Sequence, residues 1–538
     1  MSTATLSASV AAPSRAPLPQ LDHKPGRMTV LLFVVLLVGG AIYTGMSLNH
    51  DVQASGWQTA SYLPFILLGL ALLIALGFEF VNGFHDTANA VATVIYTHSL
   101  TPNFAVVWSG LFNFLGVLVS SGAVAFGIIA LLPVELILQV GSGAGFAMVF
   151  ALLIAAIVWN LGTWALGLPA SSSHTLIGSI IGVGVANALM HGRDGTSGVD
   201  WAQATKVGYS LLLSPLIGFT VSALLLLLLK ALVKNKDLYE EPKSNAPPPW
   251  WIRSILVLTC TGVSFAHGSN DGQKGMGLIM LILVGCVPLT YALNRAMPAS
   301  EMTQFVAVAE VTQRSLLEGT STPTPGDPRT ALTEYVRTKQ LKADTVPAIA
   351  AMVGAIGRQV KEYGTLAQVP ATAVNNVRND MYLTSESLRA LDKSKATLSA
   401  DAKKNAGEFK KEIDDATKFI PLWVKVAVAI ALGLGTMVGW KRIVRTVGEK
   451  IGKTHLTYAQ GASAELVAMC TIGAADMFGL PVSTTQVLSS GVAGTMAANR
   501  SGLQWGTVRN LAMAWVLTLP AAMVLSGSLY WLLNKLFT

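Results

Sequence analysis

Two copies of one short motif decide how this chain folds: GLPASSSH at residues 167–174 and GLPVSTTQ at residues 479–486. The match extends further, because residues 167–187 align with residues 479–499 without a gap and share eight of twenty-one amino acids. Both copies interrupt apolar segments with a proline and a run of hydroxyl side chains. An unpaired backbone N–H or C=O group is costly in hydrocarbon. The repeated interruption therefore indicates a functional break in the helix, at the same position in two related halves of the chain.

The composition is that of a polytopic membrane protein. Of the 538 residues, 52% are hydrophobic and only 12% are charged, about half the charged fraction of an ordinary soluble domain. We predict an all-α polytopic membrane protein with about 10–12 transmembrane or re-entrant helices in two inverted repeats and a soluble helical insertion. Apolar runs long enough to cross a bilayer lie at residues 28–48, 104–132, 146–170, 207–229 and 511–533.

Charge divides the chain into parts. Residues 294–420 carry 17 of the 37 Lys and Arg residues and 15 of the 29 Asp and Glu residues, so we place the soluble helical insertion there. The first membrane block, residues 28–293, holds repeat 1 and the start of repeat 2. Residues 421–538 form the second block, and residues 1–27 form an N-terminal tail.

The net charge of +8 does not indicate a nucleic acid partner, because the basic residues lie in loops between apolar runs. The excess of Lys and Arg in the loops at residues 230–253 and 441–453 indicates that both loops lie in the cytoplasm. Cys260, Cys286 and Cys470 lack metal-ligand spacing, so we interpret them as packing residues.

The repeated hydroxyl motif predicts an anion site. Pro169 and Pro481 each start a half-helix in this interpretation, which places hydroxyl groups beside free backbone N–H groups and the positive end of the helix dipole. Neutral donors suit a multivalent oxyanion that must be released again. The alternative is that small hydroxyl residues only let the helices pack closely. The predicted phosphate ligands are Ser171, Ser172, Ser173, Thr175, Ser483, Thr484, Thr485 and Gln486, together with Asp86 and Asp271.

The two acidic members of this set come from a second, weaker repeat, which pairs residues 80–89 with residues 265–274. A carboxylate inside a membrane span is costly enough that function is the default expectation, although each Asp could simply cap a half-helix. Asp86 and Asp271 would coordinate a coupling cation or accept a hydrogen bond from a protonated phosphate. The second role discriminates hydrogen phosphate from sulfate, which has no O–H donor at neutral pH.

Coupling residues are expected beside these motifs. His85, His174 and His267 are candidates for proton coupling, although a buried histidine is more often only hydrogen-bonded. Lys274 takes the repeat position of Asn89, where a fixed ammonium would neutralise the bound anion or replace a mobile cation. The predicted coupling or cation residues are His85, Asn89, Asn270, Lys274 and His174, and Glu79, Glu465 and Asp476 are weaker candidates.

These motifs resemble those of the PiT family of inorganic phosphate transporters, most closely the bacterial low-affinity permeases. The resemblance rests on NGFHDTANAVAT at residues 82–93, GLPASSSHTLIG at 167–178, HGSNDGQKG at 267–275 and PVSTT at 481–485. It implies a multi-pass carrier in the plasma membrane, the inner membrane in bacteria. It also implies phosphate held by the two hydroxyl motifs, cation sites at the Asn-Asp motifs, and Mg, Ca or Zn as co-substrates in a neutral metal-phosphate complex.

Two residues depart from the pattern of the sodium-coupled relatives, which carry GANDVANA in both halves. His85 replaces the first Asn of one copy, and Lys274 replaces the last Asn of the other. An ammonium repels sodium and supplies no oxygen ligand, so we predict phosphate import by proton symport, without enzymatic activity or a resident cofactor. Sodium coupling, transport of another oxyanion such as sulfate, a membrane enzyme acting on phospholipid phosphate, a phosphate sensor and a homodimer stay open.

Overall fold

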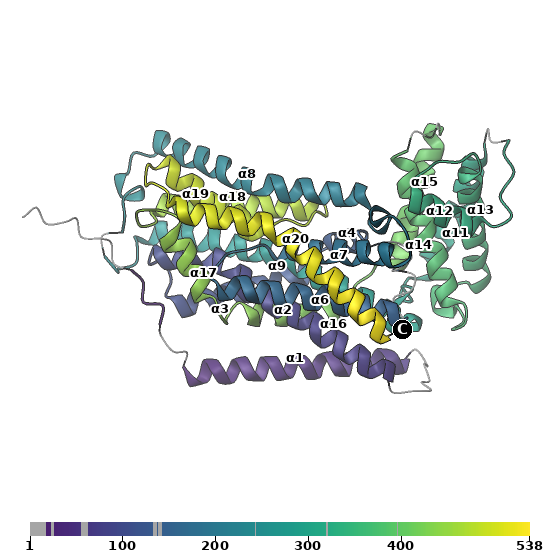
Figure 1. Ribbon diagram of the computed structural model, residues 1–538, viewed down its shortest axis with the longest axis horizontal. Coiled ribbons are helices and arrows are strands. Elements are labelled where there is room, and N and C mark those ends of the chain that lie inside the picture. Colours follow the sequence, from purple (N-terminus) through teal and green to yellow (C-terminus); the bar gives the residue numbers. More distant parts are fainter. Residues whose placement is uncertain are drawn as a thin grey trace, which may run out of the picture.

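The computed structural model of this protein is built of helices (Figure 1). Seven helices in the part of the chain that it describes are long and apolar enough to cross a membrane, namely α1, α2, α3, α6, α7, α8 and α20. The prediction of an all-α polytopic membrane protein is confirmed. The structure describes residues 18–22, 26–54, 63–132, 137, 142–242, 244–318, 321–394, 396 and 398–537, with the backbone alone at residues 63–64, 87–89 and 537.

One helix, α9 (Trp250–Cys286), runs through the middle of the membrane bundle, and every residue from Ala266 to Leu283 is buried. It carries the second copy of the Asp motif, and α2 carries the first. The remaining bundle helices are α1 (Arg27–Ala54), α2 (Leu63–Tyr96), α3 (Pro102–Val119), α4 (Ala123–Ile129), α6 (Gly143–Ala165), α7 (Ser172–Met190), α8 (Trp201–Leu232), α16 (Leu422–Gly435), α17 (Lys441–Arg445), α18 (Tyr458–Met477), α19 (Thr484–Ala498) and α20 (Trp505–Phe537).

The apolar run at residues 104–132 is two helices, where the sequence predicts one span. The chain breaks between α3 and α4 at Gly122, whose φ of 88° lies in the left-handed region that glycine adopts without strain. The break lets α4 turn toward α9, where the backbone N–H of Val124 donates to the side chain of Gln273 at 2.9 Å. Apolar character alone therefore did not reveal the break.

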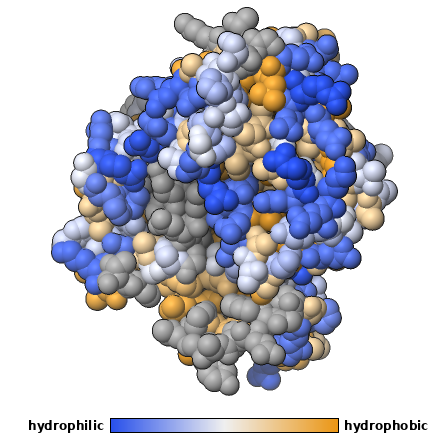
Figure 2. All heavy atoms as spheres, turned by 90° about the vertical axis from the view of Figure 1, so that its right-hand side faces the viewer, coloured by the Kyte–Doolittle hydropathy of each residue, from blue (hydrophilic) through white to orange (hydrophobic). Residues whose placement is uncertain are grey.

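The polar segment between the two blocks folds as a separate helical bundle at one end of the molecule (Figure 1). It has its own apolar core, in which the rings of Phe305 and Phe409 lie 5.3 Å apart. Seen end-on, most of its described surface is hydrophilic (Figure 2). Its helices are α11 (Ala299–Leu317), α12 (Pro328–Thr338), α13 (Thr345–Tyr363), α14 (Val374–Asp392) and α15 (Ala400–Thr417), and α10 (Pro288–Tyr291) leads into it.

Ion pairs hold this insertion against the membrane bundle. Asp200, which precedes α8, lies 3.4 Å from Arg389 of α14 and 3.5 Å from Lys339. The basic loops meet at the far end of α8, where the backbone N–H of His455 donates to Glu241 at 3.1 Å. The insertion and the basic loops therefore lie at opposite ends of the bundle (Figure 1).

Candidate functional site

Each hydroxyl motif forms the start of a helix inside the bundle. Ser171 caps α7 by accepting a hydrogen bond from the backbone N–H of His174, and Ser483 caps α19 by accepting one from Gln486, both at 3.2 Å. Both helices begin three residues after the motif proline, at Ser172 and at Thr484. The two copies therefore adopt the same local structure, and the prolines lie in the extended segments that precede the helices.

Asp86 of α2 joins the two motifs. One carboxylate oxygen accepts a hydrogen bond from Ser172 of the first motif. The other accepts a hydrogen bond from Thr485 of the second motif at 2.6 Å and lies 3.0 Å from Nδ1 of His85. Asp86 is 3% exposed, so bulk water does not compete with these contacts. Hydrogen bonds to an ionised carboxylate are also stronger than those between neutral groups.

Further hydrogen bonds fix the extended segment before α19. Ser173 of the first motif donates to the backbone oxygen of Val482 at 2.7 Å. The amide of Asn270 donates to the backbone oxygen of Leu480 at 3.0 Å and accepts from the N–H of Val482 at 3.4 Å. The second motif is thus held both by the first motif and by α9.

The second Asp of the weaker repeat lies in a charged cluster on α9. Asp271 is fully buried and accepts a charged hydrogen bond from Lys274, with 2.5 Å between Oδ2 and Nζ. Nε2 of His267 lies 3.5 Å from the same oxygen, and its Nδ1 lies 2.7 Å from the side-chain oxygen of Asn113. Ligand atoms of Asp86, His267 and Asp271 all lie within 4.8 Å of one another, so the structure gathers both Asp motifs into one site.

Several buried polar atoms of these motifs have no hydrogen-bond partner among the described residues. They include the hydroxyl of Thr484, the amide nitrogen of Gln486, Nδ1 of His174 and the second oxygen of Asp271. An unsatisfied buried polar atom costs about 1–3 kcal/mol. Three of these atoms belong to the first turns of α7 and α19, where a helix N-terminus favours an anion.

Not every predicted residue faces this cluster. Thr175 donates to the side chain of Asn160 at 2.9 Å, so it anchors α7 to α6. Nε2 of His85 lies 3.1 Å from the hydroxyl of Thr163, so this histidine connects Asp86 to α6. The side chain of Asn89 lies outside the part of the chain that the structure describes.

The weaker acidic candidates have separate surroundings. Glu465 is fully buried on α18 and accepts hydrogen bonds from the threonines at 93 and 259, the latter at 2.5 Å. Asp476 accepts hydrogen bonds from Ser269 and Gln273, both at 2.6 Å. Glu79 is also fully buried, and Asn82 donates to it at 3.3 Å. Glu465 and Asp476 therefore tie α18 to α2 and α9, whereas the contact between Glu79 and Asn82 lies within α2.

Four supporting residues were missed in the sequence: Asn113, Asn160, Thr163 and Gln273. All four have a polar side chain at a position that the bundle buries, and each contacts a motif residue or the break before α4. For Asn113, Asn160 and Thr163 the signal available was an amide or hydroxyl side chain inside an apolar run, whereas Gln273 lies within the motif at residues 267–275. Because such residues also occur at ordinary helix contacts, that signal alone does not identify them.

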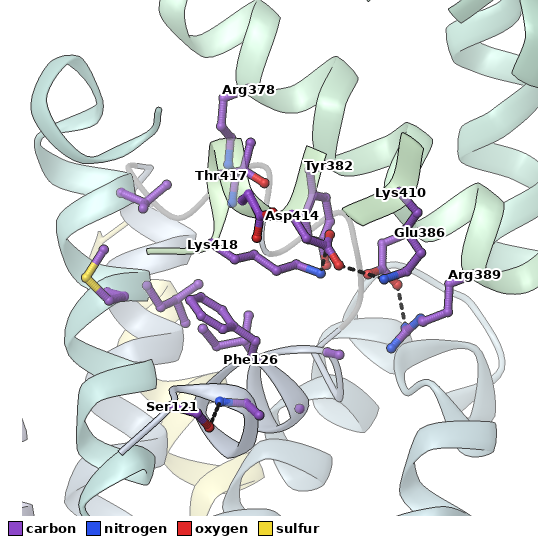
Figure 3. A pocket seen from close by; sticks show the side chains of 18 residues that line it. Ser121, Phe126, Arg378, Tyr382, Glu386, Arg389, Lys410, Asp414, Thr417 and Lys418 are labelled. Carbon is purple, nitrogen blue, oxygen red and sulfur yellow. Dashed lines mark hydrogen bonds and ion pairs between the residues drawn. The ribbon is translucent and has the colours of Figure 1, made fainter. Parts of the chain in front are cut away.

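A cavity of about 470 Å³ that is lined by several charged side chains lies between α4 and the insertion, apart from the hydroxyl motifs (Figure 3). Arg378 and Tyr382 of α14 line it opposite Phe126 of α4. Most of its charges are compensated locally, because Lys410 and Lys418 flank Asp414 at 2.6 and 2.7 Å and Arg389 pairs with Glu386. Neither hydroxyl motif lines this cavity.

Comparison with known proteins agrees with the site. Residues 82–526 match the phosphate transporter family PHO4. The low-affinity inorganic phosphate transporters PitB and PitA of Escherichia coli K12 are both 42% identical to this chain, over 88% and 87% of it and over 97% and 96% of their own lengths. A probable low-affinity inorganic phosphate transporter of Bacillus subtilis is 29% identical over 88% of this chain and 99% of its own length.

A solved structure of a sodium-dependent phosphate transporter also matches, with a TM-score of 0.47 and 19% identity, over 87% of this chain and 99% of that one. The sequence match spans both hydroxyl motifs and both Asp motifs of the site. The chain therefore belongs to the PHO4 phosphate transporter family.

Proposed function

We propose that this protein imports inorganic phosphate by proton symport, with phosphate bound between the two hydroxyl motifs beside Asp86. The observation that carries this proposal is the joint contact of Ser172 and Thr485 with that one carboxylate. A hydrogen phosphate ion can donate its O–H group to Asp86 and accept hydrogen bonds from both hydroxyl groups as they leave the carboxylate. Sulfate cannot make the first of these contacts, so the arrangement favours phosphate.

The charges of the site support a co-transported cation. When ionised, Asp86 and Asp271 carry two negative charges, and Lys274 carries one positive charge at 2.5 Å from Asp271. A phosphate anion that enters adds negative charge to a buried site that is already formally negative. Buried charge is costly unless it is paired, so an accompanying cation would lower the cost of binding. Because the Lys274 ammonium already occupies Asp271, a proton fits better than a sodium ion.

The order of the helices supports two repeats, and we propose that their topologies are inverted. The weaker repeat relates α2 to α9, and the hydroxyl repeat relates α7 to α19. The intervening and following helices then correspond in order, so that α3, α4, α6 and α8 match α16, α17, α18 and α20. Each hydroxyl-motif helix packs against the last helix of the other half, α7 on α20 and α19 on α8. Rocking one half against the other would then alternate access to the shared site.

A divalent metal-phosphate complex is a second candidate substrate. The donor atoms of Asp86, His267 and Asp271 lie close enough together to take part in holding one cation, and the phosphate that arrives with the metal would offset its repulsion by the Lys274 ammonium. Carboxylate oxygen suits Mg and Ca, and the addition of imidazole nitrogen suits Zn. We propose this complex as cargo, entering and leaving with phosphate.

The test is uptake of radioactive phosphate into proteoliposomes with proton and sodium gradients imposed separately. Acceleration by an inward proton gradient alone supports the proposal, and acceleration by sodium alone contradicts the coupling. Excess sulfate should leave uptake unchanged. A chelator should abolish uptake, and added Mg, Ca or Zn should restore it, if the metal complex is the substrate.

A further inference from the structure

The first helix, α1, is only loosely packed on the bundle near its N-terminus. All three buried residues of α1, Gly40, Thr44 and Val52, lie in its C-terminal part. There it touches α16, where Gly40 meets the side chain of Ile430. Residues 27–39 include no buried residue, and Figure 1 shows α1 along the edge of the molecule. In this N-terminal part, the ring of Phe33 lies 6.4 Å from the ring of Phe80 of α2, but the other side chains stay largely exposed.

A cavity of about 970 Å³ opens where α1 stands off, bounded by α1, α3, α6 and α17. This volume is at the upper end of the roughly 300–1,000 Å³ typical of ligand pockets. Its walls are mainly apolar, with Val30 and Phe33 of α1 facing Phe104 and Val107 of α3. Apolar walls that open between membrane helices suit acyl chains.

One end of this cavity is basic. Lys441, Arg442 and Arg445 of α17 line it, and Asp22 is the acidic residue among its lining. Asp22 lies 3.6 Å from Lys441. Arg442 lies over the ring of Trp164 at 4.8 Å, and within the described parts of the chain no carboxylate lies at ion-pair distance from it. Arg445 lies 4.0 Å from Glu449, so the three cations face two carboxylates and the basic end keeps a net positive charge.

We propose that this cavity, the α1 pocket, binds an anionic phospholipid. Arg442 and Arg445 would hold the phosphodiester headgroup, and the acyl chains would lie along the apolar walls. Charge complementarity selects this occupant, because basic pockets between transmembrane helices bind anionic headgroups and guanidinium groups match the geometry of phosphate oxygens. A zwitterionic lipid brings its own ammonium and gains less from three cations. The lipid would fill the space between the exposed N-terminal part of α1 and the rest of the bundle.

Native mass spectrometry of the full-length protein in detergent tests this proposal. The protein is mixed with equal amounts of phosphatidylglycerol and phosphatidylcholine, and the lipid adducts are counted. We expect the wild type to retain phosphatidylglycerol in preference, and the Arg442→Gln/Arg445→Gln variant to bind it about tenfold more weakly. A matched control, Lys230→Gln/Lys234→Gln, removes two basic residues from the same end of the bundle but outside the pocket, and should keep the preference.

A second variant tests whether lipid loss in the first one reflects misfolding. Val30→Trp fills the pocket from α1, where the side chain is 47% exposed, and leaves all three cations in place. It should also lose phosphatidylglycerol. Equal retention of the two lipids by the wild type, or unchanged retention by both pocket variants, would overturn the proposal. The mass of a second protein chain in place of lipid, lost in the same variants, would overturn it as well.

Discussion

Thr485 donates a 2.6 Å hydrogen bond to Asp86, although 399 residues separate them in the chain. Asp86 belongs to the Asp motif of the first half, and Thr485 belongs to the hydroxyl motif of the second. Since Ser172 of the first hydroxyl motif contacts the same carboxylate, both halves meet at one side chain. A movement of one half relative to the other would change these two hydrogen bonds, so we expect the surroundings of Asp86 to differ between the states of the transport cycle.

Replacing Asp86 with Asn should abolish phosphate uptake and leave the protein in the membrane. The amide keeps the shape of the side chain but loses the charge and one of the two acceptor oxygens, so Ser172 and Thr485 can no longer both donate to it as they do to the carboxylate. Uptake of radioactive phosphate per protein in the membrane fraction measures this. Asp51→Asn is the matched control, because Asp51 accepts hydrogen bonds from Tyr291 and Trp423 away from the site. Near-normal uptake by Asp86→Asn would refute its central role.

Ser172→Ala and Thr485→Val should each raise the KM for phosphate about tenfold. Each variant removes one hydroxyl donor, and a hydrogen bond to a charged group is worth about 1.5–3 kcal/mol. Initial uptake rates over a range of phosphate concentrations give the KM. Ser490→Ala removes a hydroxyl from the same helix as Thr485, where it donates only to the backbone of Val487, and should leave the KM unchanged. A normal KM in both site variants would show that phosphate binds elsewhere.

Lys274→Asn should change which cation drives uptake. The variant removes the ammonium that lies 2.5 Å from Asp271 and restores the residue that the other repeat has at this position. A mobile cation could then take the vacated place, so uptake should gain stimulation by sodium and become less dependent on pH. Imposed sodium and proton gradients measure both effects. Unchanged dependence on both cations would exclude a role for Lys274 in coupling.

The sequence could predict the local structure of each motif but not the contacts between motifs. The Ser171 and Ser483 caps follow from local rules for helix starts, and the membrane helices follow from apolar runs. The joint contacts of Asp86 depend on how α2, α7 and α19 pack. Periodicity carries no information on such contacts between distant segments. The break at Gly122 was missed for another reason, because a glycine with positive φ is invisible in a hydropathy pattern.

In the insertion, Asp414→Asn should loosen α15 against α14, because Asp414 accepts a 2.7 Å hydrogen bond from Ser385 of α14 while Lys410 and Lys418 keep it ionised. Burial alone would raise the pKa of Asp414, but Lys418 and Lys410 outweigh burial and hold the pKa below its ordinary value. A carboxylate with a lowered pKa stabilises the fold above its unfolded pKa, and this contribution is lost as the pH falls through its folded pKa, here below about pH 4. We expect faster hydrogen exchange in both helices of the full-length variant at neutral pH.

The matched control for this prediction is Glu408→Gln on the same helix. Its exposed side chain pairs with Lys404 at 3.9 Å, and exposed pairs contribute little. Hydrogen exchange in α14 and α15 should therefore stay at the wild-type rate. Equal rates in the Asp414→Asn protein would show that the ionised Asp414 and its hydrogen bond from Ser385 do not hold α15 against α14.

Gly268→Ala should destabilise the whole bundle. A methyl group at this position would lie 2.1 Å from the backbone oxygen of Asn113, so α3 and α9 must move apart, which typically costs about 1–3 kcal/mol. Gly473→Ala is the control, because its methyl group meets nothing within 4 Å and alanine favours the interior of a helix. Thermal unfolding in detergent should show a lower Tm for Gly268→Ala and an equal or higher Tm for Gly473→Ala. If both variants unfolded at the wild-type temperature, the close crossing of α3 and α9 would be wrong, and with it the place of His267 beside Asn113.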